Sequence, residues 1–177
     1  MIRIMKYGEV ANADIFARVV PEVDVQKIVA DIIADVRTRG DEALYEYCEK
    51  FDRVRLEALE VSPAELDAAI GKVEPEFIDV LETAAANIRL FHEKQVRNSF
   101  IIAEKDGVVM GQKVTPLDRV GLYVPGGTAA YPSTVLMDAI PAKIAGCPEV
   151  VMVTPPARNG KVNPAILAAA RVAGIDR

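Results

Sequence analysis

Apolar side chains in the first half of the chain recur at the three- and four-residue spacing of amphipathic helices. Residues 25–36 show this spacing, which predicts a helix over 24–39 with Asp24 as its N-cap and Gly40 just after its end. The same spacing and further capping signals predict three more helices, at 41–51, 61–73 and 75–96. This part of the chain is therefore expected to be mostly helical.

The last two of these helices carry the most detailed signals. Ser62 is placed to cap the third helix, with Pro63 as its first residue and Glu65 completing a capping box. The fourth helix is the longest, and its spacing predicts a buried face made of Phe77, Leu81, Ala84, Ile88 and Phe91. We interpret these helices as a scaffold.

The pattern changes to short strand-like runs in the middle of the chain. Two such runs flank Asp106 and Gly107, which is a strong signal for a β-hairpin with a type I′ turn. The sequence TPLD then breaks the chain, and we place a domain boundary near residue 118. The first region, residues 1–118, is thus expected to be mostly helical with a β-hairpin near 98–114.

Residues 119–177 alternate between strand and helix signals. The run RVGLYV predicts a strand, and a helix follows at 133–145 with a proline inside it that is expected to bend it. A second strand, EVVMV, precedes a second helix, NPAILAAARVAG. The order β-α-β-α begins a doubly wound sheet. We therefore expect an α/β fold in which a helical N-terminal region with a hairpin precedes the start of an incomplete Rossmann-like parallel sheet.

Composition excludes several classes of protein. The net charge of −5 is spread along the chain without a basic stripe, which argues against nucleic-acid binding. No apolar run approaches the ~20 residues of a membrane helix, and the first residues lack the apolar core of a signal peptide. Cys48 and Cys147 are spaced for neither a metal knuckle nor a redox pair. We expect a cytoplasmic protein that binds neither nucleic acid nor membrane.

The segment RVGLYVPGGTAAYP is the candidate binding loop. It lies between a predicted strand and a helix N-terminus, where open α/β sheets bind ligands. Gly126 and Gly127 would let a ligand approach the backbone, and Tyr123 could stack on a ring or hydrogen-bond a ribose. Alternatively, the glycines only form a tight turn and Tyr123 is an edge residue of the core. The residues alone leave both interpretations open.

No catalytic set is evident in the sequence. His92 is the only histidine, and no Ser-His-Asp or Cys-His arrangement accompanies it. Paired acidic residues fall at predicted helix starts, where the helix dipole favours negative charge. We therefore expect neither catalytic residues nor metal ligands in this chain.

Four stretches resemble the histidinol dehydrogenase family and keep its order: VRTRGDEALYEYCEKFD, AAANIRLFHEKQ, GQKVTPLDRVGLYVPGG and the continuation through PSTVLMDAIPAKIAGCPEVVMVTPP. They cover almost the whole chain. The resemblance implies a zinc enzyme that uses NAD to oxidise L-histidinol to L-histidine in two steps, at the end of histidine biosynthesis. It also implies a homodimer with sites built from both chains, and a contact between Tyr123 and NAD.

The chain departs from the family in length, since family members are more than twice as long. Their zinc ligands, their Glu-His acid–base pair and their other NAD contacts lie beyond the resembling region, so none maps onto this chain. The resemblance therefore implies an inactive N-terminal portion of the enzyme. There are two alternatives: a short paralogue that acts as a binding or interaction module, and a complete small nucleotide-binding enzyme. The ending AGIDR is typical of a helix that leads into another strand, and it argues against both.

A two-stranded parallel sheet is also too small to cover its own apolar surface. We therefore expect exposed apolar side chains in this chain.

Overall fold

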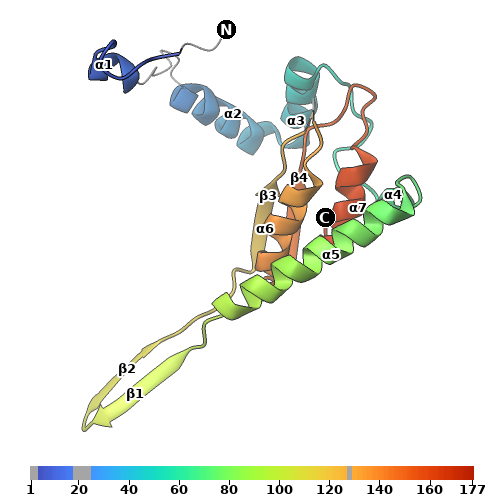
Figure 1. The fold of residues 1–177 in the computed structure, drawn as a ribbon. Coiled ribbons are helices and arrows are strands. Elements are labelled where there is room, and N and C mark those ends of the chain that lie inside the picture. Colours follow the sequence, from blue (N-terminus) through green and yellow to red (C-terminus); the bar gives the residue numbers. More distant parts are fainter. Residues whose placement is uncertain (1–3, 18–24, 127–128) are drawn as a thin grey trace. The chain divides into compact units, whose positions relative to one another are not determined.

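The structure is a computed structural model that describes residues 4–17, 25–126 and 129–177. The chain forms two compact units, Met1–Ala43 and Leu44–Arg177 (Figure 1). Along the described residues, none of the helices combines the length and the apolar character needed to cross a lipid bilayer.

The first unit contains α1 (Asn12–Ile15) and α2 (Val25–Arg39). The end of α2 is as predicted: Gly40 adopts φ +60°, and its N–H group donates to the carbonyl of Val36 at 2.8 Å. The predicted N-cap, Asp24, lies outside the described residues. The apolar stripe of α2 is largely exposed, so this helix contributes no buried side chain.

The predicted helix at 41–51 is present but changes form along its length. It begins as α3 (Asp41–Tyr47) and continues as a wider π-helical turn, Cys48–Asp52. Arg53 closes that turn in the left-handed conformation, with φ +57°. Side-chain periodicity alone does not distinguish an α-helical turn from a π-helical one, so the sequence did not predict this change.

The capping box predicted at the start of α4 (Pro63–Ile70) is confirmed. The hydroxyl of Ser62 accepts from the Glu65 N–H group at 3.2 Å, and the Glu65 carboxylate accepts from the Ser62 N–H group at 3.3 Å. Each interaction satisfies a backbone donor that the first helical turn leaves without a partner.

The long helix α5 (Pro75–His92) ends in a 3-10 turn, Glu93–Gln95. Leu81 is buried on its inner face, and the predicted face is otherwise partly buried through Phe77, Ala84 and Ile88. The prediction was wrong for Phe91, which is 64% exposed. The last turn of α5 contributes nothing to the buried core, and the ring of Phe91 makes an edge-on contact with His92 instead.

The predicted hairpin is formed by β1 (Phe100–Lys105) and β2 (Val108–Gln112), which pair antiparallel and extend beyond the end of α5 (Figure 1). The turn type was wrong. A type I′ turn needs positive φ at both central residues, whereas only Gly107 has it. The register also shifts within the hairpin, between Ile102 and Lys105, before the two-residue connection that joins Lys105 to Val108. The hydroxyl of Ser99 joins the two arms at their base by accepting from the Val114 N–H group at 2.9 Å.

The predicted β-α-β-α order is confirmed. Strands β3 (Arg119–Tyr123) and β4 (Glu149–Val153) run parallel, with α6 (Pro132–Ile144) as the crossover and α7 (Pro164–Ala173) after β4. Beyond α7, the Arg177 N–H group donates to the carbonyl of Val150, and its carbonyl accepts from the Met152 N–H group. These two bonds are those of a parallel ladder on the free side of β4. The fold is therefore of the expected α/β class.

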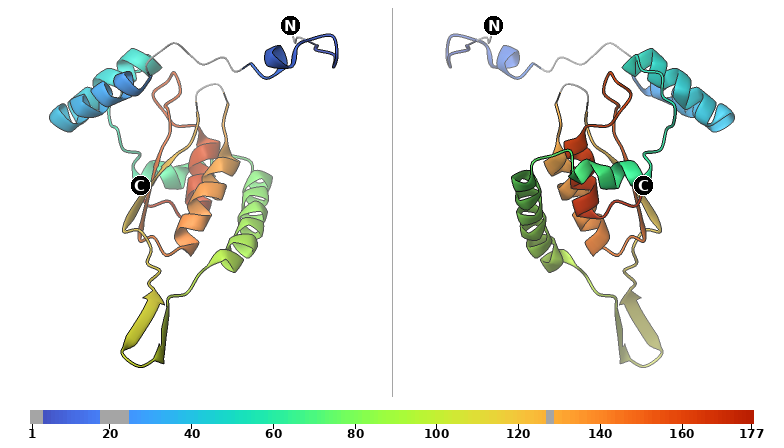
Figure 2. Two further views of the ribbon diagram at one scale, coloured as in Figure 1. Left: turned by 90° about the vertical axis from the view of Figure 1, so that its left-hand side faces the viewer. Right: turned by 90° about the vertical axis from the view of Figure 1, so that its right-hand side faces the viewer.

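One face of the strand pair carries the core. Val120, Leu122 and Val150 lie on this face and share one core with α5, α6 and α7. The three helices pack side by side (Figure 2), and α6 contacts both strands. Tyr123 and Val153 alternate with them and lie exposed on the opposite face. Because α5 belongs to this core, residues on both sides of position 118 share it, and the boundary expected there stays a prediction.

Two ion-pair clusters fix the residues that follow α7. The Asp176 carboxylate accepts from the Lys143 ammonium at 2.6 Å and from the Val150 N–H group at 2.7 Å. Arg177 donates two hydrogen bonds of 3.0 Å to the carboxylate of Glu60. Asp176 and Arg177 thereby hold together three parts of the fold: the end of α6, the start of β4 and the loop before α4.

These contacts predict an acid dependence of stability. The pKa of the Asp176 carboxyl is lowered, first by the hydrogen bond from Lys143 and then by the one from the Val150 N–H group. Because the folded-state pKa is the lower one, the stabilisation is complete above the unfolded value of about 3.9 and is lost as the pH falls through the folded value. We expect Asp176→Asn to lower the free energy of unfolding at neutral pH, and this deficit to shrink toward acid pH.

Urea unfolding of the wild-type protein and the variant from about pH 7 to about pH 3 measures this deficit. Asp67→Asn is the control, because Asp67 forms only an exposed ion pair with Arg171 at 2.9 Å and exposed pairs contribute about 0–1 kcal/mol. A deficit for Asp176→Asn that stayed constant across the pH range would contradict the prediction.

Candidate functional site

The carboxyl ends of β3 and β4 form one edge of the sheet, and a hollow of about 90 Å³ lies there. Its lining comes from the loop after β3, the segment after β4 and the start of α7: Gly126, Ala129, Ala130, Thr154, Pro155, Ala157, Asn163 and Ile166. Ligands of open α/β sheets bind at this edge. The predicted binding loop therefore lies at the expected edge of the sheet.

Tyr123 is the last residue of β3 and pairs with Val153. Its side chain is 63% exposed on the face of the sheet that the core helices leave uncovered. The interpretation of Tyr123 as an edge residue of the core finds no support in this exposure. The ring is accessible for stacking, and the phenol for a hydrogen bond.

Gly126 has a structural reason to be glycine that is independent of any ligand. A Cβ atom at this position would lie 3.1 Å from the Thr154 hydroxyl oxygen and 3.2 Å from the Pro155 carbonyl oxygen. The loop after β3 therefore packs its backbone directly against the segment after β4. Gly127 lies outside the described residues.

The N-terminus of α6 faces the same loop and differs from that of α7. No side chain caps α6 at Tyr131, whereas the side-chain oxygen of Asn163 caps α7 by accepting from the Ala165 N–H group at 2.9 Å. The first N–H groups of a helix without such a cap are available to an anionic group. The uncapped end of α6 thus adds favourable electrostatics to the edge that carries Tyr123.

Sequence reasoning missed the segment after β4. Thr154 contributes a hydroxyl to the hollow beside Pro155 and Ala157. The signal was available, because the letters TPP directly follow the predicted strand EVVMV and must emerge at the same edge as the loop after β3.

The other reactive side chains lie elsewhere. His92 is half-buried at the end of α5, where its Nδ1 atom lies 2.7 Å from the Gln95 side-chain oxygen. Burial, and then the charge of Asp52, raises the pKa of the Cys48 thiol, which keeps it less nucleophilic near neutral pH. Among the described residues, no three or more His, Cys, Asp or Glu side chains gather as a metal site would require. These residues do not fit a zinc ion.

The contact at Gly126 predicts a cost for adding a single methyl group. Gly126→Ala places its Cβ against Thr154 and Pro155, so that one of the two segments must move by a few tenths of an ångström. We expect a loss of about 1–2 kcal/mol in the free energy of unfolding, measured by chemical denaturation. Gly121→Ala is the matched control, because nothing lies within 4 Å of its added Cβ. Equal stability of the two variants would show that the two segments are not in close contact.

Comparison with known proteins agrees with the resemblance seen in the sequence. A family model described as histidinol dehydrogenase matches residues 18–177. The histidinol dehydrogenase of Clostridium acetobutylicum is 53% identical over 154 residues, which cover 87% of this chain and 36% of that protein. The histidinol dehydrogenase of Heliobacterium mobile is 46% identical over 179 aligned positions, covering 99% of this chain and 42% of that protein.

A solved structure supports the same conclusion. The crystal structure of histidinol dehydrogenase from Elizabethkingia anophelis matches 90% of this chain with a TM-score of 0.84 and 41% sequence identity, and the match covers 37% of that chain. This chain thus spans about two-fifths of the length of the relatives that it matches. On sequence and on fold, the chain belongs to the histidinol dehydrogenase family.

Proposed function

We propose that this chain supplies part of the cofactor-binding side of a histidinol dehydrogenase, an enzyme that oxidises L-histidinol to L-histidine with NAD and zinc in two steps. The observation that carries the proposal is the position of Tyr123. Its exposed ring ends a parallel strand at the edge where α/β sheets bind nucleotides, next to a helix N-terminus without a side-chain cap. Membership of the family supports the same role.

Each proposed contact has a distinct physical task. The ring of Tyr123 packs against a ring of the cofactor, or its hydroxyl hydrogen-bonds a ribose. The N-terminus of α6 favours a negatively charged phosphate group. Gly126 keeps the loop backbone close to Thr154, and Gly127 is proposed from the resemblance alone. Bound NAD would supply a hydride acceptor, and these residues would hold and orient it.

The chain supplies only part of such a site. Pockets for ligands of drug or cofactor size enclose roughly 300–1,000 Å³, whereas the hollow at this edge encloses about 90 Å³. The described residues also lack a ligand set for zinc. We therefore propose that NAD, zinc and L-histidinol are bound together with residues of the longer family chain and, as in the family, of a second subunit. We propose further that this chain alone is inactive.

A chimera in which this chain replaces the matching part of the Clostridium acetobutylicum relative tests the role of Tyr123. We expect Tyr123→Ala to raise the KM for NAD by about fivefold or more, since a stacked or hydrogen-bonded ring contributes on the order of 1 kcal/mol. Tyr123→Phe separates the two contacts, because it keeps the ring and removes the hydroxyl.

Steady-state kinetics with NAD and L-histidinol varied in turn, together with zinc analysis, provide the measurement. Phe91→Ala is the matched control, because it removes an aromatic ring of nearly equal exposure, 64%, from the last turn of α5. An unchanged KM for NAD together with a loss of zinc would make Tyr123 a structural residue and refute its proposed role.

A second prediction concerns the chain by itself. We expect the purified protein to hold no stoichiometric zinc and to form no NADH from L-histidinol, because one histidine and scattered carboxylates cannot replace a tetrahedral ligand set. Metal analysis after dialysis and an absorbance assay measure both properties. One tightly held zinc per chain, or sustained turnover, would contradict the proposal.

A further inference from the structure

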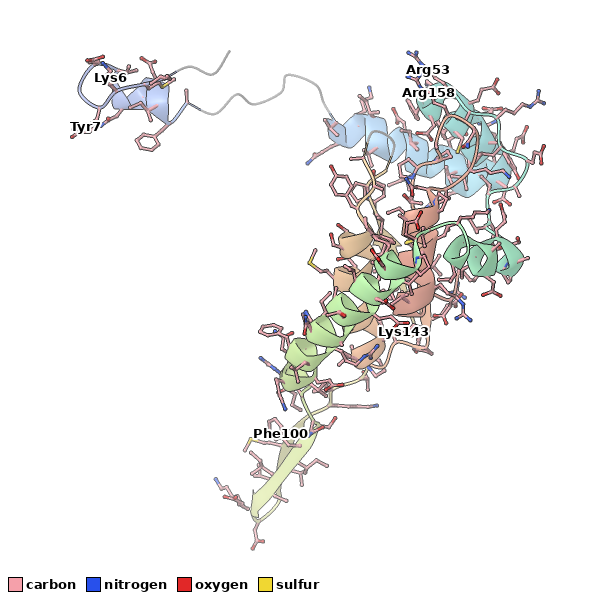
Figure 3. All side chains as sticks on the ribbon, turned by 45° about the vertical axis from the view of Figure 1, so that its right-hand side comes forward. Lys6, Tyr7, Arg53, Phe100, Lys143 and Arg158 are labelled. Atoms are coloured by element: carbon pink, nitrogen blue, oxygen red, sulfur yellow. The ribbon has the colours of Figure 1, made fainter. Side chains whose placement is uncertain are left out.

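The hairpin β1–β2 carries a cluster of exposed apolar side chains, which we call the hairpin surface: Phe100, Ile101, Ile102, Val108, Val109 and Met110. Ile101 is 77% exposed and Val109 is 72% exposed. Figure 3 shows Phe100 on the hairpin, with side chains projecting from both of its sides. Monomeric soluble proteins rarely leave so continuous an apolar surface uncovered.

Both faces of the hairpin are apolar, and this feature decides what can cover it. Ile101 pairs with Gly111, while the neighbouring pair Ile102 and Met110 points to the opposite face. A hairpin with one face in water would carry polar side chains on that face. The pattern is instead that of strands that lie inside a sheet covered on both sides.

The described part of the chain does not provide such a cover. Every residue of β1 and β2 is exposed, and the two strands pack extensively only against each other among the described elements. A two-stranded hairpin is at best marginally stable in water without further strands or a packed helix. The outer edges of β1 and β2 also present unpaired backbone groups to which further strands can bind.

The comparisons identify a source of that cover. In the Elizabethkingia anophelis structure the matched region, similar with a TM-score of 0.84, makes up only 37% of the chain, so most of that polypeptide lies outside it. A second copy of the present chain is a poorer candidate, because a symmetric contact through one hairpin face leaves the other face in water.

We propose that the hairpin surface is the docking site for the part of a histidinol dehydrogenase polypeptide that lies outside the matched region. That polypeptide adds strands along the hairpin edges and covers both hairpin faces with apolar side chains. The inference rests on family membership and on the exposure of the hairpin. It requires no contact with NAD, so the two proposals can fail separately.

Co-expression tests the docking. An affinity-tagged form of this chain is produced together with the untagged part of the Clostridium acetobutylicum relative that lies outside its 154 matched residues. Purification on the tag, followed by size-exclusion chromatography with light scattering, measures how much of the second polypeptide is retained. We expect a complex with one copy of each polypeptide.

Two variants probe the two faces separately. Val109→Lys and Met110→Lys place a charge on opposite faces of the hairpin, and we expect each to reduce the retained polypeptide by at least ~10-fold. Val80→Lys on α5 is the control, since Val80 is 62% exposed and lies far from the hairpin in the sequence. We expect this control to retain the partner as the wild-type chain does. Thermal unfolding of each tagged chain checks that the core is intact, because the hairpin contributes nothing to it.

Three results would overturn the proposal. The first is full retention of the second polypeptide by both hairpin variants. The second is no retention by the wild-type chain. The third is a homodimer of this chain that either Val109→Lys or Met110→Lys dissociates, and that persists when the second polypeptide is present. Such a homodimer would make the hairpin surface a contact between two copies of this chain.

Discussion

One apolar core, formed by one face of the β3–β4 pair and by the mutually packed helices α5, α6 and α7, is the constraint on which the rest of this fold depends. Consecutive alanines, Ala168 to Ala170, are fully buried on α7, which packs closely against α6 and α4. β3 and β4 run parallel, and each is followed by a helix of this core, α6 after β3 and α7 after β4. The loops after the two strands therefore emerge at the same edge of the sheet. The position of the candidate site is therefore a consequence of core packing.

Features encoded by neighbouring residues were predictable from the sequence. The capping box at Ser62 depends on side chains within one helical turn and is formed as expected. The cap of α7 by the Asn163 side chain is equally local. The alternation of strands and helices after residue 118 was equally clear. Predictions failed where the structure depends on more than neighbouring residues in the sequence. The exposure of Phe91 depends on where the core ends, and the backbone angles of the hairpin turn are not those that its Asp-Gly dipeptide favours.

The candidate site shows the same division. General rules for parallel sheets place Tyr123 and the loop after it at a ligand-binding edge, and the structure has that edge. The contact that requires glycine at position 126 involves Thr154 and Pro155, nearly thirty residues away. A glycine pair in a loop suggested access for a ligand, whereas at Gly126 the structure shows close packing between two backbone segments. Only the three-dimensional structure distinguishes these two reasons for a glycine.

The contacts of α5 also have a consequence for the order of events during synthesis. Its buried face packs against α6 and α7, yet α7 begins only at Pro164, long after α5 ends at His92. At roughly 5–20 residues per second, a ribosome needs several seconds to make the intervening chain. During that interval α5 has emerged with an apolar stripe and without its partners. An apolar stripe exposed in this way is prone to aggregation until translation supplies the rest of the core.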